Sequence, residues 1–138
     1  MDAAILDTDM LSEVLKRKDQ QVLTTARNYL IRHRRLAFSA MSMYEVVRGL
    51  RANGATRRLA AFQQTVASSD VFSISTNVLM RAAELWAEAH TNGHPRNDAD
   101  LIIAATALEE GRVLATDNTA HYAWIPGIRL SDWRSSTP

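Results

Sequence analysis

The sequence predicts an α/β fold in which a short, mostly parallel sheet is covered by helices on both faces. Short apolar segments of strand length alternate with longer segments whose apolar residues recur at helical spacing. Strands that are separated by helices pair in parallel through right-handed crossovers, and the helices then cover both faces. Because no repeat, linker or low-complexity tract divides the chain, we expect one domain over residues 1–134, with a frayed tail at 135–138.

The first half of the chain is expected to supply two strands and four helices. The short apolar segment at residues 3–6 is typical of a buried strand, and the helix after it is expected to be capped by Thr8 or Asp9. A cationic turn suits the C-terminal end of the second helix, and Asn53-Gly54 ends the third. In chain order, we expect strands at 3–6 and 36–39 and helices at 9–17, 20–35, 42–52 and 56–67.

The second half is expected to supply three strands and two helices. Residues 71–74 combine β-branched and aromatic side chains, which favours a strand. An apolar stripe at helical spacing follows, and Asn92-Gly93-His94-Pro95 ends that helix. In chain order, we expect strands at 71–74, 112–116 and 128–130 and helices at 76–90 and 97–110.

Composition excludes several kinds of site. The chain has no cysteine, so disulfides, thiolate zinc sites, iron–sulfur clusters and cysteine nucleophiles are excluded, and a reducing cytoplasm is the expected compartment. Apolar stretches such as residues 101–105 are far shorter than the roughly 20 residues of a membrane span, and no leader peptide is recognisable, so we expect no membrane association.

Arginine dominates the positive charge. The chain has fourteen Arg and two Lys, but its net charge is only +1, which argues against coating nucleic acid through bulk electrostatics. Arginines cluster at residues 32–35 and 57–58, with Arg48 and Arg51 between them. They either lie at solvated helix ends or form a patch that binds an RNA backbone or an acidic partner.

Three carboxylates are expected at strand ends or in first turns of helices: Asp7, Glu45 and Asp100. Each has a structural alternative, because Asp7 suits a helix cap, Glu45 completes a capping box with Ser42, and Asp100 suits the start of its helix. In a parallel sheet these positions gather at one edge, where carboxylates repel one another unless a cation is present. Oxygen ligands select Mg²⁺ or Mn²⁺, and such an ion indicates phosphodiester hydrolysis.

In this order and spacing, several motifs resemble PIN-domain ribonucleases of the VapC toxin type over nearly the whole chain. They are Ile5-Leu6-Asp7-Thr8, Ser42-x-x-Glu45-Val46-x-x-Gly49, Asp100-x-x-Ile103-Ala104-Ala105-x-Ala107, Leu114-Ala115-Thr116-x-Asn118 and Ile125-Pro126-Gly127-Ile128-Arg129-Leu130-x-x-Trp133. The resemblance implies a three-layer α/β/α sandwich and Mg²⁺- or Mn²⁺-dependent endonucleolytic cleavage of RNA. It also implies a homodimer, a VapB-type antitoxin and a higher toxin–antitoxin assembly.

The resemblance also assigns the site. Asp7, Glu45 and Asp100 match the three acidic positions of the family and are the expected metal ligands, with Asp7 and Asp100 binding directly and Glu45 binding through a water or serving as its base. The fourth acidic position holds Asn118, so Asp117, one residue earlier, is the remaining catalytic candidate and decides between one ion and two. Supporting roles around the carboxylates are expected for Thr8, Thr116 and Asn118, and Asp98 is expected either to cap its helix or to play such a role.

Two other functions fit parts of the sequence. Asp7-Thr8-Asp9 imitates the nucleophile motif of haloacid-dehalogenase-type phosphatases, but that chemistry needs a later cation, generally Lys, and both lysines, Lys16 and Lys18, lie near the first helix. The acids can instead receive an arginine from a partner, which would make the chain a non-catalytic binding module. A zinc site at His90 and His94 is disfavoured, because Gly93 and Pro95 interrupt the helix between them.

Overall fold

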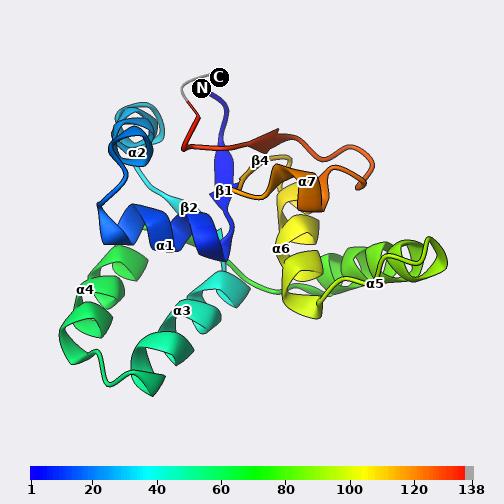
Figure 1. Ribbon diagram of the computed structural model, residues 1–138, viewed down its shortest axis with the longest axis horizontal. Coiled ribbons are helices and arrows are strands. Elements are labelled where there is room, and N and C mark those ends of the chain that lie inside the picture. Colours follow the sequence, from blue (N-terminus) through cyan, green and yellow to red (C-terminus); the bar gives the residue numbers. More distant parts are fainter. Residues whose placement is uncertain (136–138) are drawn as a thin grey trace.

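The computed structural model describes residues 1–135, which form a sheet between two layers of helices (Figure 1). This confirms the α/β/α sandwich. In chain order the elements are β1 (Ala4–Leu6), α1 (Thr8–Lys16), α2 (Gln20–His33), β2 (Ala37–Ser39), α3 (Ala40–Ala52), α4 (Thr56–Ala67), β3 (Asp70–Phe72), α5 (Thr76–Thr91), α6 (Asp98–Glu109), β4 (Val113–Ala115), α7 (Thr119–Tyr122) and β5 (Leu130–Ser131).

The first strand of the chain is the central strand of the sheet. The strand order is β3-β2-β1-β4-β5, and every neighbouring pair is parallel. Leu6 is in register with Phe38 of β2 on one side and with Ala115 of β4 on the other. The carboxyl ends of these three strands are therefore level with one another, which places the residues that follow them at one edge of the sheet.

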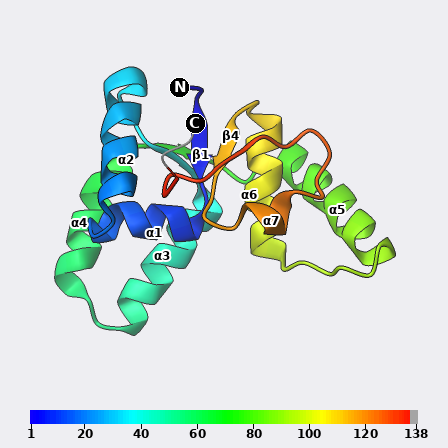
Figure 2. The same ribbon diagram turned by 45° about the horizontal axis from the view of Figure 1, so that its top comes forward.

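The two faces of β1 contribute to different cores, as the alternation of side chains along a strand requires. Ala4 and Leu6 pack with Phe38 of β2 and with side chains from α1, α2, α3 and α4, including Phe62 of α4. Ile5 points to the opposite face and packs with side chains from α5 and α6. Figure 2 shows the same division, with α1 to α4 on one side of the strands and α5 to α7 on the other.

Tyr29 of α2 ties both ends of the described chain to the sheet. Its hydroxyl accepts a hydrogen bond from the Ala4 amide (3.0 Å) and donates to the Ala4 carbonyl (3.2 Å). Its ring packs against Trp133, which is 1% exposed, with the ring centroids 5.3 Å apart. The C-terminal segment is thereby packed against the helix that holds the first strand.

Several expected boundaries were wrong by a few residues. The third helix begins at Ala40 rather than Ser42, because its cap is Ser39, whose side chain accepts from the Met41 amide. The third strand begins and ends earlier, at Asp70–Phe72, and the edge strand lies later, at Leu130–Ser131. Helix α7 was not expected at all.

Of the predicted tail, residues 136–138 lie outside the described part of the chain, and the Ser135 amide donates to the Asp132 carbonyl (3.0 Å). No helix within residues 1–135 is long and apolar enough to cross a membrane.

Candidate active site

The carboxyl edge of the sheet carries the predicted acidic residues on four different segments. Asp7 follows β1, Glu45 lies in α3 directly after β2, and Asp117 comes two residues after the end of β4. Asp100 lies in the first turn of α6. The parallel order of the sheet thus brings together residues that are up to 110 positions apart in the sequence.

Asp7 is buried, with 5% of its surface exposed, and it is the cap of α1. One carboxylate oxygen accepts from the Met10 amide (2.8 Å), and the carboxylate is also hydrogen bonded to the Thr116 side chain. The expectation that Thr8 or Asp9 caps this helix was therefore wrong. Burial raises the pKa of Asp7 to about 6, and the negative charges of Asp9 and Asp117 add to the rise, against the effect of the two hydrogen bonds.

Glu45 does not serve as a helix cap. Because α3 begins at Ala40, Glu45 lies in its second turn, and the predicted capping box with Ser42 was wrong. Its carboxylate instead accepts from the Thr8 hydroxyl (2.7 Å) and pairs with Arg48 (3.4 Å). The Thr8 hydroxyl also lies 3.1 Å from the Ser42 hydroxyl, so Thr8 positions Glu45 across the edge of the sheet.

Two side-chain nitrogen atoms, one from Asn97 and one from His121, contact the same carboxylate oxygen of Asp100. Asn97 caps α6 by accepting from the Asp100 amide (2.8 Å), and its side-chain amide donates to Asp100 Oδ2 (2.9 Å). His121 Nε2 also lies 2.9 Å from Asp100 Oδ2. The side chain that caps α6 is therefore Asn97 rather than Asp98. Asp98 instead lines a shallow pocket together with Trp86.

Asp117 supplies the negative charge expected at the fourth acidic position, and Asn118 contacts Thr116. The Asp117 carboxylate lies 4.0 Å from an Arg134 nitrogen, and its carbonyl accepts from Arg134 (2.8 Å). Its negative charge still reaches the site, because it raises the pKa of both Asp7 and Asp9. The Asn118 amide donates to the Thr116 hydroxyl (3.1 Å), so Asn118 helps to fix a buried threonine that contacts Asp7.

Three residues of this site were missed in the sequence. Desolvation and the charges of Asp117, Asp100 and Glu45 raise the pKa of Asp9, so Asp9 belongs to the acidic cluster. Tyr122 is buried, and its own desolvation, the charges of Asp100 and Asp7 and a hydrogen bond with Asp100 all raise its pKa. His121 and Tyr122 both lie in α7, and only the prediction of that short helix would have placed them near Asp100.

The chemistry of the cluster suits a hard divalent cation. Asp7, Asp9, Glu45, Asp100 and Asp117 supply oxygen donors, and their charges make it harder to ionise Asp7 and Asp9, as expected where like charges are not neutralised. Within residues 1–135, however, no three His, Asp or Glu side chains are arranged so that they could hold a metal ion as they stand. Glu45 and Asp100 are oriented by hydrogen bonds with Thr8, Arg48, Asn97 and His121.

Comparison with known proteins agrees with this geometry. The PIN domain family matches residues 4–123. The tRNA(fMet)-specific endonuclease VapC of Salmonella typhimurium is 26% identical over 130 residues, which cover 94% of this chain and 96% of that protein. The VapC ribonuclease Y4jK of Sinorhizobium fredii is 32% identical over 126 residues, which cover 86% and 89%.

Solved structures show the same fold. A DNA-bound VapBC complex from Salmonella typhimurium has a chain that superposes with a TM-score of 0.84 at 25% identity and covers 96% of this chain and 99% of its own. A chain of VapBC2 from Rickettsia felis has the same TM-score at 19% identity, covers 95% and 98%, and supports the fold alone.

Proposed function

Because the chain belongs to the PIN-domain family, and within it to the VapC group, we propose that it is the toxin of a toxin–antitoxin pair and cleaves RNA with the aid of Mg²⁺ or Mn²⁺. The observation that carries this proposal is the convergence of the carboxylates at one sheet edge, where Asp7 is buried with its pKa raised to about 6. Burying a carboxylate costs folding free energy unless a ligand of opposite charge compensates for it.

Asp7, Glu45 and Asp100 are the residues that would hold the ion, with Asp117 and Asp9 adding negative charge around it. A bound Mg²⁺ or Mn²⁺ would polarise the attacking water and neutralise charge that develops on the phosphate. Glu45, held by the Thr8 hydroxyl, accepts the proton of the attacking water or orients that water. His121 and Asn97 restrain the Asp100 carboxylate, and Thr116 restrains that of Asp7.

Asparagine variants of two carboxylates test the proposed activity. Asp7→Asn and Asp100→Asn should abolish RNA cleavage in Mg²⁺ or Mn²⁺ while the fold is retained, because each removes a negative donor without changing side-chain size. Glu84→Gln, which neutralises an exposed carboxylate of α5, is the matched control and should cleave like the wild type. Full activity in both asparagine variants would contradict the proposal.

Metal titration separates a nuclease from a non-catalytic binding module. By calorimetry, the wild type should bind Mn²⁺ more tightly than Asp7→Asn, whereas a module that uses its acids only to receive a partner's arginine should show no difference. PIN-domain membership argues against the hypothesis of a phosphatase that uses Asp7 as its nucleophile.

Mapping RNA ends after induction of the wild type and of Asp7→Asn would identify the RNA that is cleaved.

The partners follow from the same assignment. We propose a VapB-type antitoxin that neutralises the toxin in the cytoplasm, a nuclease domain that spans residues 1–134, and a homodimer that enters the toxin–antitoxin assembly. The dimer contact is assigned to the apolar face of α5 and α6, because Leu79, Met80 and Trp86 of α5 are exposed by 48%, 62% and 47%. Leu79 and Trp86 line a shallow pocket with Leu101 and Ile102 of α6.

A further inference from the structure

A groove of about 910 Å³ lies between helices α1, α2, α3 and α4. Its floor is apolar and includes Leu15, Leu36 and Phe62. At one place it is lined by Thr8 and Glu45, which are hydrogen bonded to each other at the carboxylate site. The groove is therefore continuous with the proposed site of RNA cleavage.

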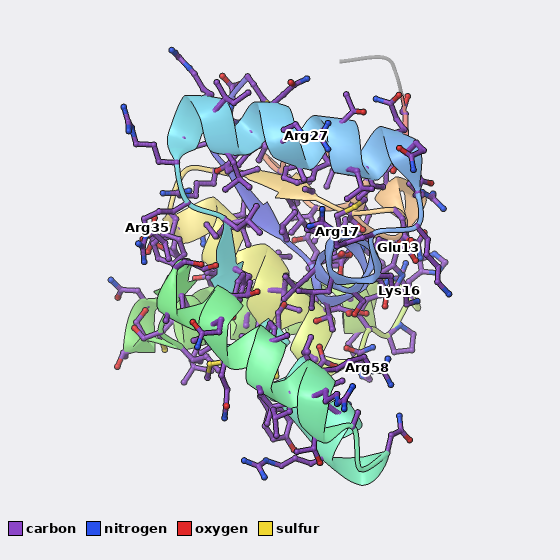
Figure 3. The ribbon with its side chains drawn as sticks, turned by 90° about the vertical axis from the view of Figure 1, so that its left-hand side faces the viewer. Glu13, Lys16, Arg17, Arg27, Arg35 and Arg58 are labelled. Atoms are coloured by element: carbon purple, nitrogen blue, oxygen red, sulfur yellow. The ribbon has the colours of Figure 1, made fainter. Side chains whose placement is uncertain are left out.

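Positive charge is concentrated along this groove. It is lined by one carboxylate, that of Glu45, and by five cationic side chains, all of them exposed, which are Lys16, Arg17, Lys18, Arg34 and Arg58. The groove thus has an excess of four positive charges in a chain whose net charge is +1. Figure 3 looks at this side of the molecule and shows Lys16 and Arg17 at the end of α1, with Arg58 of α4 below them on the same side.

Most of these cations have no acidic partner. Within residues 1–135, Lys16 pairs with Glu13 (3.6 Å), whereas Arg17, Lys18, Arg34 and Arg58 form no ion pair. Exposed arginines elsewhere in the described chain are of both kinds: Arg35 pairs with Asp70 and Arg129 with Asp2, whereas Arg27, Arg32, Arg51 and Arg57 form no ion pair. The groove therefore presents free guanidinium groups to a ligand.

Two of these arginines have an unfavourable backbone conformation. Arg17 (φ 56°) and Arg34 (φ 71°) are the residues other than glycine that have a positive φ in the described chain. They are the C-caps of α1 and α2, a position at which glycine is usual because it has no Cβ to clash. Compensation of the helix dipoles does not explain them, because Lys16 already lies in the last turn of α1 and Arg32 in that of α2.

We propose that Arg17 and Arg34 bind phosphates of the RNA substrate, which reaches the carboxylate site along this groove. The inference rests on the proposed ribonuclease function and names residues that bind its substrate. Guanidinium groups suit phosphate oxygens because they donate two parallel hydrogen bonds. Unpaired bases can pack against an apolar floor while the backbone follows the cations, so the groove suits single-stranded RNA.

Glycine variants separate binding from folding. Arg17→Gly and Arg34→Gly each remove a guanidinium and relieve the left-handed backbone, so the melting temperature should stay the same or rise. Binding is measured by fluorescence anisotropy with a labelled single-stranded oligoribonucleotide in EDTA, where cleavage is prevented. Each variant should raise Kd about fivefold at 0.1 M salt and reduce the slope of log K against log salt by about 0.7, the value for one lost phosphate contact.

Two controls accompany these variants. Arg27→Ala removes an exposed guanidinium of α2 that does not line the groove, and it should leave Kd and the salt slope unchanged. Arg17→Lys keeps the charge and should restore the salt slope. If the wild type binds the oligoribonucleotide and the glycine variants bind it equally well, the proposal is overturned.

Other outcomes also overturn it in distinguishable ways. Glycine variants that keep RNA affinity but no longer bind the antitoxin would assign the groove to a protein segment. A wild type that neither binds nor cleaves RNA would contradict the ribonuclease function itself. A lower melting temperature in both glycine variants would contradict the argument from backbone strain.

Discussion

Replacing Asp7 with asparagine should stabilise the metal-free protein at neutral pH. The pKa of Asp7 is 3.8 in its ordinary state and about 6 in the fold, chiefly because the side chain is buried. A difference of this size corresponds to roughly 3 kcal/mol of folding free energy that is lost when the group ionises. Asparagine avoids that loss and remains a good cap, because its side-chain oxygen can still accept from the Met10 amide.

The sign of this effect fixes its pH dependence. Below about pH 4, Asp7 is protonated both in the folded and in the unfolded chain, so the two proteins should differ little. As the pH rises, the unfolded carboxyl ionises first, and the folded wild type loses stability until the pH passes the folded pKa of about 6. The stability that Asp7→Asn gains over the wild type should therefore increase between pH 4 and pH 6 and reach its full value at about pH 7.

Urea unfolding in EDTA at pH 4.5, 6 and 8 measures this difference. Asp19→Asn is the matched control, because Asp19 caps α2 through the Gln21 and Val22 amides but is partly exposed, and it should not gain stability as the pH rises. Added Mg²⁺ should stabilise the wild type and not Asp7→Asn. The reasoning fails if Asp7→Asn is less stable than the wild type at pH 8, since the buried charge would then stabilise the fold.

Three further changes test other parts of the structure. Tyr29→Phe should cost about 1–3 kcal/mol in urea unfolding, because the Ala4 amide loses its hydroxyl partner inside the core. Trp86→Glu should leave the melting temperature unchanged and convert the dimer to a monomer in light scattering, and a persistent dimer would place the contact elsewhere. His121→Ala should weaken Mn²⁺ binding in calorimetry by about 10- to 100-fold, and His121→Gln by less, because Asp100 loses a restraint.

Much of the fold could be predicted because the strands and helices differ clearly in length and spacing. The apolar segments at β1, β2 and β4 are short and are separated by helices, which favours parallel pairing and places Asp7, Glu45 and Asp100 at the same edge. The convergence of the acids followed from this topology and needed no knowledge of side-chain contacts.

Local competition between similar residues could not be resolved from the sequence. Asp7, Thr8 and Asp9 are all good caps, and the choice of Asp7 depends on where β1 ends in the sheet. Ser42 and Glu45 have capping-box spacing, but β2 runs directly into α3, so Ser39 takes the cap. The contact of His121 with Asp100 depends on α7, a helix of four residues that carries almost no periodic signal.

The central position of β1 has a consequence during synthesis. The first strand to leave the ribosome pairs on one side with β4, whose residues 113–115 are made near the end of translation, and Tyr29 packs against Trp133, which is made later still. The nascent chain therefore lacks a strand on that side of Asp7 and has no Asp117 until most of it has emerged. A ribosome that makes this protein is exposed to the complete cluster of carboxylates only after the chain is almost complete.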